Sequence, residues 1–302
     1  MKNNLDSIKT IVKSDLEELE SSIENFLNSD NPLSAELKKI LMAPAKRLRP
    51  LLGFLFLRCC FANLNQKQKN ILLSVELIHN ATLIHDDIID ESKTRRNQET
   101  LNAKFDENLA VIAGDYLLSV AMEKILSTNS LNILKEFVNA LKQTCTGEIN
   151  QYFSKFSIPT LEDYIEKSKE KTALLFKVGI TCGILAKEEA LDENLLKIAE
   201  TFGENFGIAF QIRDDLLNII NSGNDKDSGV YTAPIIFAIQ ENQNILNEDN
   251  LYEAIKKTKS LEKTVTLMDN YFTRALDAIS ELENNKFKQG IEDLIKTLKV
   301  EI

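Results

Sequence analysis

The segment ELIHNATLIHDDIIDESKTRR, residues 76–96, decides both the fold and the chemistry expected of this chain. Its apolar residues recur at helical spacing, so we predict an amphipathic helix that begins near Gln66. On that helix Asp86 and Asp90 lie one turn apart on the same face. Because like charges at this spacing destabilise a helix and the neighbours are isoleucines, the pair indicates a hard-cation site suited to Mg²⁺. A solvated acidic helix end is the alternative interpretation.

Composition predicts one all-α domain over residues 1–302. The chain is 43% hydrophobic, which is enough for one large core. Only five prolines occur, and no stretch alternates with the period of a strand, so we expect helices and no sheet. The expected helices are 5–27, a short one capped by Ser34, then 51–61, 106–127, 131–156, 161–186 and 191–220, with a polar loop at 221–233 and four shorter helices after it.

Charge and hydropathy exclude several classes of protein. The net charge of −10 argues against a nucleic-acid surface, and no apolar run approaches the roughly 20 residues of a membrane span. The N-terminus is acidic and amphipathic, unlike a signal or transit peptide. The four cysteines form no CxxC pair, so we expect a cytoplasmic protein without disulfides.

A second acidic cluster lies in FGIAFQIRDDLLNII, residues 206–220. Asp214 and Asp215 again sit on an apolar helix, and Asn218 follows about one turn later. If the two clusters face each other across a helical bundle, they would hold several Mg²⁺ ions between them. Protein groups alone would not neutralise those ions, so we infer a polyanionic ligand, most naturally a diphosphate.

Basic residues next to apolar segments fit the same ligand: Lys46, Arg47, Arg49, Arg95, Arg96 and Lys171. Arginine in particular is suited to bidentate phosphate binding. For Arg95 and Arg96, an ordinary charge at a helix end is the alternative.

Other enzyme classes lack their required residues. Glu76 and His79 form an ExxH as used in di-iron bundles, but the sequence contains no second ExxH. There is no GxSxG, no Cys/His pairing and no glycine-rich nucleotide loop.

Jointly and in their order, these residues resemble the trans-type isoprenyl diphosphate synthases, the polyprenyl synthetase family, over essentially the whole chain. The matching pieces are Lys46-Arg47-Leu48-Arg49-Pro50, Ile84-His85-Asp86-Asp87-Ile88-Ile89-Asp90, Arg95-Arg96, Ala113-Gly114-Asp115-Tyr116, Lys171-Thr172-Ala173 and Ala209-Phe210-Gln211-Ile212-Arg213-Asp214-Asp215. The resemblance implies an all-α bundle around a deep central cavity, a homodimer, and Mg²⁺-dependent condensation of isopentenyl diphosphate with an allylic diphosphate.

The same resemblance implies roles for individual residues. Isopentenyl diphosphate would bind Lys46, Arg49, His79 and Arg96, and the allylic diphosphate would bind Arg95, Lys171, Thr172 and Gln211. Roughly three Mg²⁺ ions would bind Asp86, Asp90 and Asp214 when diphosphate is present. The catalytic residues would be Asp86, Asp87, Asp90, Asp214, Asp215 and Lys171.

Resemblance and sterics together predict a long product, about 30 to 45 carbons, for quinone side chains. Short-chain members often carry an aromatic residue shortly before the first aspartate motif, whereas Ala81 and Thr82 are small. Ala81 could instead serve close helix packing. A farnesyl or geranylgeranyl diphosphate synthase is the alternative function.

Three departures from the family pattern bear on activity. Pro44-Ala45 replaces the usual Gly-Gly, and Asn218 is a weaker metal ligand than aspartate. Val230 stands where Gly-Lys is expected, with Lys226 the doubtful equivalent of a diphosphate-binding lysine. These departures keep open a low-activity regulatory subunit of a heteromeric synthase. A class I terpene cyclase, which also ionises diphosphates with a DDxxD motif, is a third alternative. It would not need the predicted second diphosphate site, so that site favours condensation.

Overall fold

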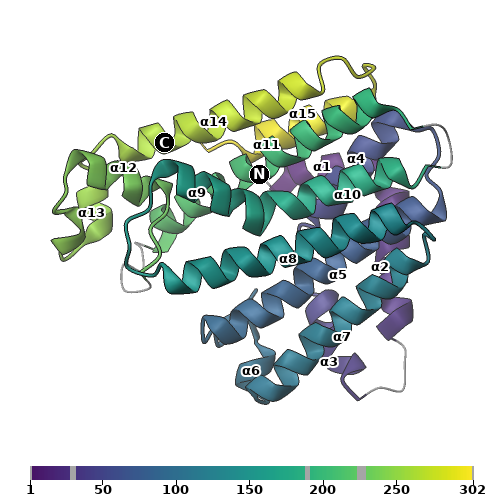
Figure 1. Ribbon diagram of the computed structural model, residues 1–302, viewed down its shortest axis with the longest axis horizontal. Coiled ribbons are helices and arrows are strands. Elements are labelled where there is room, and N and C mark those ends of the chain that lie inside the picture. The colour runs from purple at the N-terminus through teal and green to yellow at the C-terminus, as the bar shows by residue number, and fades with distance from the viewer. Residues whose placement is uncertain (1, 28–31, 188–190, 223–228, 301–302) are drawn as a thin grey trace.

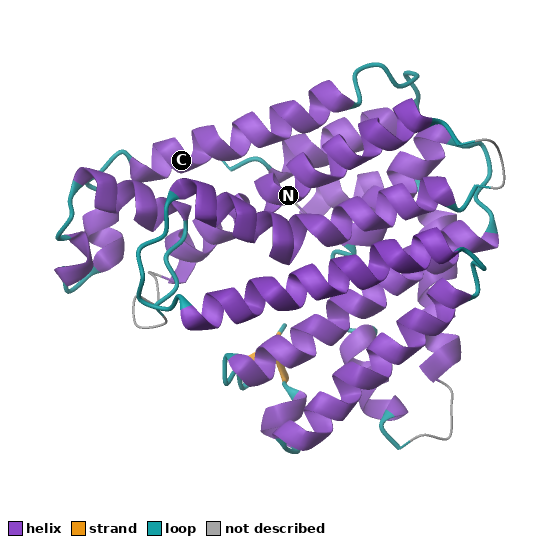
Figure 2. Ribbon diagram, in the orientation of Figure 1, coloured by secondary structure: helices purple, strands orange, loops and turns teal. Residues whose placement is uncertain are grey.

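A computed structural model of the chain describes residues 2–27, 32–187, 191–222 and 229–300. Almost every regular element in these residues is a helix, which confirms the predicted all-α fold (Figures 1 and 2). The helices up to the organising one are α1 (Lys2–Ile11), α2 (Lys13–Leu27), α3 (Ser34–Leu41), α4 (Leu48–Cys60) and α5 (Gln66–Ile89). The rest are α6 (Leu101–Lys104), α7 (Glu107–Leu126), α8 (Leu131–Phe153), α9 (Leu161–Ser168), η1 (Lys169–Ala173), α10 (Leu174–Leu185), α11 (Glu193–Ser222), α12 (Ala233–Glu241), η3 (Ile245–Asn247), α13 (Leu251–Ile255), α14 (Ser260–Ala278) and α15 (Lys286–Leu298). No helix of the described segments is long and apolar enough to cross a membrane.

Helix α5 is the organising helix and begins at Gln66, as predicted. Asn65 and Gln68 form a capping box at its start, in which each side chain accepts a hydrogen bond from the other residue's backbone N–H. The helix packs against α4, α7 and α10, so most of its side chains are buried. Gly114 permits the close approach of α7, because a Cβ there would collide with the ring of His85.

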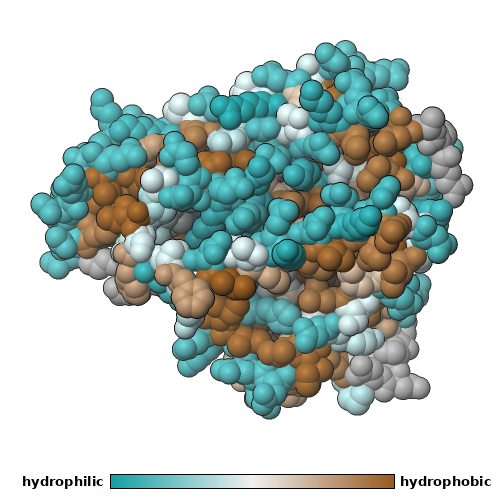
Figure 3. Space-filling model, in the orientation of Figure 1, coloured by the Kyte–Doolittle hydropathy of each residue, from teal (hydrophilic) through white to brown (hydrophobic). Residues whose placement is uncertain are grey.

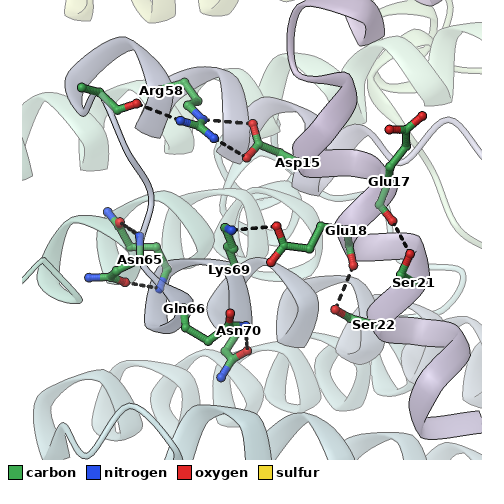
Figure 4. Close-up of polar contacts among 12 residues, drawn as sticks. Asp15, Glu17, Glu18, Ser21, Ser22, Arg58, Asn65, Gln66, Lys69 and Asn70 are labelled. Atoms are coloured by element: carbon green, nitrogen blue, oxygen red, sulfur yellow. Dashed lines mark hydrogen bonds and ion pairs between the residues drawn. The ribbon is translucent and has the colours of Figure 1, made fainter.

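Ion pairs fix α2 against α4 and α5 (Figure 4). Asp15 of α2 is buried and accepts two hydrogen bonds from Arg58 of α4, at 2.7 and 3.0 Å. Glu18 accepts one from Lys69 of α5 at 2.7 Å. The fork geometry of the arginine–aspartate pair holds α2 in one orientation on the bundle.

Aromatic rings fill the core between α4, α10, α11 and α14. Phe202 stacks on Phe56 with ring centroids 5.3 Å apart, and Phe206 packs edge-on against Phe176 and Phe272 at 5.2 and 5.8 Å. A second, smaller core joins the end of α11 to α12, α13 and the start of α14. The long helix α11 therefore belongs to both cores, and the second acidic motif lies on it.

Five predicted helices differ from the observed ones. Helix α4 begins at Leu48, three residues before the predicted start, with Pro50 in its first turn. The first helix is broken at Val12, and no proline or glycine marks the break. Helix α3 starts at Ser34 itself, with Leu33 in the N-cap position, so the predicted cap is displaced by one residue. The predicted helix 131–156 ends at Phe153, and the predicted helix 161–186 is interrupted by the π-helical turn η1.

A small hairpin corrects the expectation of no sheet. Strands β1 (Thr94–Arg95) and β2 (Gln98–Glu99) pair antiparallel, with Thr94 opposite Glu99. The two loop residues, Arg96 and Asn97, have φ of 52° and 61°, the left-handed geometry that tight hairpins require. The two-residue strands were too short to give a period in the sequence.

Candidate active site

A cleft of about 850 Å³ lies between the two acidic motifs. The end of α5 contributes Asp90, and α11 contributes Gln211, Asp215 and Asn218. The segment α9–η1 contributes Tyr164, Lys167 and Lys171, and Val230 and Tyr231 close one side. The structure thus brings together the two motifs that the sequence analysis paired, although they are more than a hundred residues apart in the chain.

The end of α5 shapes the first motif. Ser92 N–H donates to Asp87 O at 2.8 Å and Glu91 N–H to Ile88 O at 3.1 Å, with Glu91 at φ 50°. This is a Schellman ending, which normally uses glycine at the left-handed position. It stops the helix at Asp90, which is exposed at the rim of the cleft.

The three aspartates of the first motif have different surroundings. Asp87 is buried and bonded to Arg95 Nε at 2.7 Å. Burial raises the pKa of Asp86 to about 6; Lys171 opposes the rise, and Glu148 and Asp90 add to it. Asp86 is therefore a half-buried carboxylate whose charge is poorly balanced by protein, a suitable environment for an added cation. Asp87 instead holds the hairpin through Arg95.

The two aspartates of the second motif also have different surroundings. Asp214 is 42% exposed and accepts a hydrogen bond from Arg213 Nη1 at 2.8 Å. Asp215 is buried and accepts from Tyr164 Oη at 2.6 Å and Gln211 Nε2 at 3.0 Å. Burial raises the pKa of Asp215 to about 6, although both of those hydrogen bonds oppose the rise. Because Asp215 is held by these neighbours, Asp214 is the freer carboxylate.

The π-helical turn η1 presents Lys171 and Thr172. Helix α11 packs closely on this turn, since a Cβ at Gly207 would collide with Ala173 Cα. Thr172 Oγ1 donates a short hydrogen bond to Gln211 Oε1. Lys171 Nζ lies 2.5 Å from Glu148 Oε1. Burial acts against the charge on Lys171, but Asp86 and Glu148 outweigh it and raise its pKa.

Arg49, which lines a small cavity beside the cleft, has a buried N–H without a hydrogen bond in the described part of the chain. Arg49 Nε is buried and has no hydrogen-bond partner among the described residues, while its guanidinium lies 4.9 Å above the Phe176 ring. Burial lowers the pKa of Arg49 to about 10. Burial also holds the pKa of His79 well below its usual range, and Arg49 and Arg96 push in the same direction. An orphaned buried guanidinium N–H fits a site that takes an anion.

Lys46 and Arg96, the other residues predicted for isopentenyl diphosphate, are both exposed. Although both side chains reach solvent, surrounding protein atoms partly desolvate their charged groups. This desolvation and Arg213 lower the pKa of Lys46, and Asp214 opposes them, which puts Lys46 near the second motif. Desolvation likewise lowers the pKa of Arg96; Glu76 opposes it, and Arg47 and Arg95 act in the same direction as desolvation.

A buried hydrogen-bond network, which the sequence analysis missed, holds the segment that carries Lys46 and Arg49. Arg47 has φ 53° at the start of α4 and donates to Glu76 Oε1 at 2.8 Å and to Glu20 Oε1 at 2.7 Å. It also donates a short hydrogen bond to Leu41 O. Asn80 Nδ2 donates to Glu76 Oε1 at 3.1 Å. Glu76 is thus a structural partner of Arg47, which fits the rejection of the di-iron interpretation.

Thr82 and Ala81, predicted to set product length, have different environments. Thr82 lines a small cavity of about 30 Å³ one turn before Asp86, together with Ile78, His79, Phe137, Ala140, Leu141, Thr144, Lys171, Leu175 and Arg49. Ala81 is fully buried. Val230 lies at the cleft, whereas Lys226 falls outside the described residues.

Known proteins resemble this chain in both sequence and structure. A sequence profile of the polyprenyl synthetase family matches residues 30–269. Solanesyl diphosphate synthase 2, chloroplastic, of Arabidopsis thaliana is 30% identical, over 97% of this chain and 76% of that protein. Heptaprenyl diphosphate synthase component 2 of Bacillus subtilis is 28% identical, over 95% and 88%. A decaprenyl diphosphate synthase from Rhodobacter capsulatus has a crystal structure that matches with a TM-score of 0.90 at 26% identity, over 97% and 98%.

Proposed function

The chain belongs to the polyprenyl synthetase family, and from that premise we propose that it condenses isopentenyl diphosphate with an allylic diphosphate to make a long all-trans polyprenyl diphosphate. The observation that carries the proposal is the shared cleft, where Asp90 of one helix faces Asp215 and Asn218 of another beside Lys171. At about 850 Å³, the cleft has the volume of a small-molecule site. The solanesyl, heptaprenyl and decaprenyl relatives support a long product, for which we retain about 30 to 45 carbons.

Asp86, Asp90 and Asp214 would hold Mg²⁺, roughly three ions when diphosphate is bound. Within the described residues, no three His, Cys, Asp or Glu side chains converge into a complete metal site. Diphosphate oxygens would therefore complete the coordination, as is usual for Mg²⁺. When bound, the ions neutralise charge on the departing diphosphate.

The chain's own residues bind and orient the two substrates. Arg49 and Lys46 would hold the diphosphate of isopentenyl diphosphate, and the neutral His79 would donate a hydrogen bond without adding charge. Apolar side chains of the adjoining cavity, Ile78, Phe137 and Leu141, keep water from the carbocation left after ionisation. The double bond then attacks at close range. The released diphosphate can accept the final proton, so no side-chain base is required.

The product chain would extend past Thr82 into the small cavity between α5, α8 and α10. A volume of about 30 Å³ holds no isoprenoid tail, so side chains such as Leu141 must move as the chain grows. Thr82, a small residue that lines this cavity, leaves room for that movement.

We further propose a homodimer formed through the faces of α7 and α8. Large apolar side chains are exposed along these helices: Val111, Ile112, Leu126, Leu131, Val138, Ile149, Tyr152 and Phe153. Figure 3 shows brown, hydrophobic side chains gathered over these two helices. Size-exclusion chromatography with light scattering tests this assembly. A monomer that becomes active only with a second protein would favour the heteromeric alternative suggested by the relative named as a component.

The test of function is incubation of the purified protein alone with labelled isopentenyl diphosphate and farnesyl diphosphate. We expect chain-extended products with Mg²⁺ and none with EDTA. If no extended product forms with Mg²⁺, the catalytic proposal is wrong and the regulatory subunit becomes the better interpretation.

A further inference from the structure

Lys167 is a cation in the cleft that no sequence motif marks. It lies in the last turn of α9, half-buried, one turn before Lys171. It lines the cleft together with Lys171, Gln211, Asp215 and Asn218. Within the described part of the chain, its ammonium has neither a hydrogen bond nor an ion pair.

Three other cations of the surrounding segments are already paired with carboxylates. Arg95 lies 2.7 Å from Asp87, and Lys171 lies 2.5 Å from Glu148. Lys169, two residues after Lys167, lies 3.2 Å from Glu204. Lys155 also lines the cleft, but it is exposed and lies 5.6 Å from the centre of the Tyr152 ring. Lys167 is half-buried and, unlike Arg95, Lys169 and Lys171, has no carboxylate partner among the described residues, so its charge is left for a ligand.

The electrostatic environment of Lys167 also favours an incoming anion. Burial lowers the pKa of Lys167 and Lys171 adds to the effect, while Glu148 and Asp215 oppose it. An ammonium that loses hydration and faces a second ammonium is unfavourable until an anion enters.

We propose that Lys167 binds the diphosphate of the allylic substrate, an inference that rests on the proposed prenyl transfer. The ammonium would meet the diphosphate between Asp90 and Asn218, on the side of the cleft where Val230 offers no charge. Arg49 and His79 are not among the residues that line the cleft with Lys167, so isopentenyl diphosphate bound to them would not contact Lys167.

The test compares Lys167→Gln with Lys169→Gln, a matched lysine on the same segment that already has a carboxylate partner. The probe is inorganic pyrophosphate with Mg²⁺, titrated by calorimetry without turnover. Loss of one charge-assisted hydrogen bond should weaken pyrophosphate binding about 10- to 100-fold in Lys167→Gln. Lys169→Gln should match the wild type, and Lys167→Arg should retain most of the affinity.

Two further readouts separate binding from folding. Without ligand, Lys167→Gln should unfold at the wild-type temperature or above it, because repulsion with Lys171 is removed. In steady-state assays its KM should rise for farnesyl diphosphate and not for isopentenyl diphosphate.

Unchanged pyrophosphate affinity in Lys167→Gln would overturn the proposal, as would a wild type that does not bind pyrophosphate. A lowered unfolding temperature with equal KM increases for both substrates would assign Lys167 a structural role instead. The failure of prenyl transfer itself would be seen separately, as a wild type that binds pyrophosphate but forms no extended product.

Discussion

Replacing Glu76 with alanine should damage both stability and binding of isopentenyl diphosphate, although Glu76 is not a predicted substrate ligand. Its carboxylate is 2% exposed and lies 2.8 Å from Arg47 Nη1, which is itself 5% exposed. Arg47 stands between Lys46 and Arg49 and has a left-handed backbone at φ 53°. Such a conformation persists only where surrounding bonds hold it.

The magnitude follows from the burial of the pair. Removing one partner of a buried ion pair typically costs about 3 to 5 kcal/mol, because it leaves an unbalanced charge. Glu20 still contacts the same guanidinium at 2.7 Å and balances part of that charge. We therefore expect Glu76→Ala to lower the free energy of unfolding by about 2 to 3 kcal/mol. Glu20 is 35% exposed, so Glu20→Ala should cost only about 1 kcal/mol.

Urea unfolding measures both free energies, and steady-state kinetics measures KM for each substrate. Glu76→Ala should raise KM for isopentenyl diphosphate more than for the allylic substrate, because the loss of the Arg47 contact should shift the neighbouring Arg49. Equal destabilisation by Glu76→Ala and Glu20→Ala would refute the argument from burial. An unchanged KM for isopentenyl diphosphate would refute the link between the network and the site.

Four other predictions concern the site itself. Asp86→Asn should abolish turnover if Asp86 is a metal ligand, and near-normal rates at saturating Mg²⁺ would remove that role. The same variant, without ligand, should be more stable than the wild type at pH 7. The pKa of Asp86 in the folded wild type is raised to about 6, above the ordinary aspartate pKa of the unfolded chain. The wild type therefore loses stability as pH rises from that ordinary pKa toward 6, whereas the variant does not. Thermal unfolding across this range should show the difference vanish near pH 4, and a difference that persists there would contradict the titration. Lys46→Ala and His79→Ala should weaken isopentenyl diphosphate more than the allylic substrate, whereas equal losses in KM would show that the two sites are not divided as proposed. Thr82→Phe and Ala81→Phe should shorten the products, with the larger effect at Thr82, because Thr82 lines the small cavity. Chromatography of the products measures their length. An unchanged length distribution in the folded variants would show that neither residue lines the path of the product chain.

Much of the architecture could be predicted because it depends on local signals. The capping residues Asn65 and Asp106 precede regular apolar periodicity, so α5 and α7 begin where the sequence indicated. The two acidic motifs stand out against apolar helices, and the shared cleft follows from packing those helices face to face.

Features that depend on distant partners could not be predicted. Nothing next to Asp87 in the sequence distinguishes it from Asp86; the difference arises because the hairpin folds back and brings Arg95 to Asp87. From the sequence alone, Lys167 cannot be distinguished from a surface lysine. Only the fold brings Lys171 and Asp215 into the same cleft as Lys167. The sequence contained one indication of its role, a lysine one turn before the Lys171-Thr172 pair. It was not recognised because the π-helical turn interrupts the regular helical spacing between them.

The π-helical turn at Lys169–Ala173 also constrains how this chain can change in length. Leu174 N–H bonds to Lys169 O, five residues back, so the turn contains one residue more than an α-helical turn would. Deleting one residue within this turn would remove the extra residue and restore α-helical hydrogen bonding, so α9 and α10 would keep nearly the same faces toward their neighbours. The side chains of the turn itself, Lys171 among them, would change direction. A one-residue deletion within α10 would instead rotate one side of that helix by about 100° relative to the other and disturb the core.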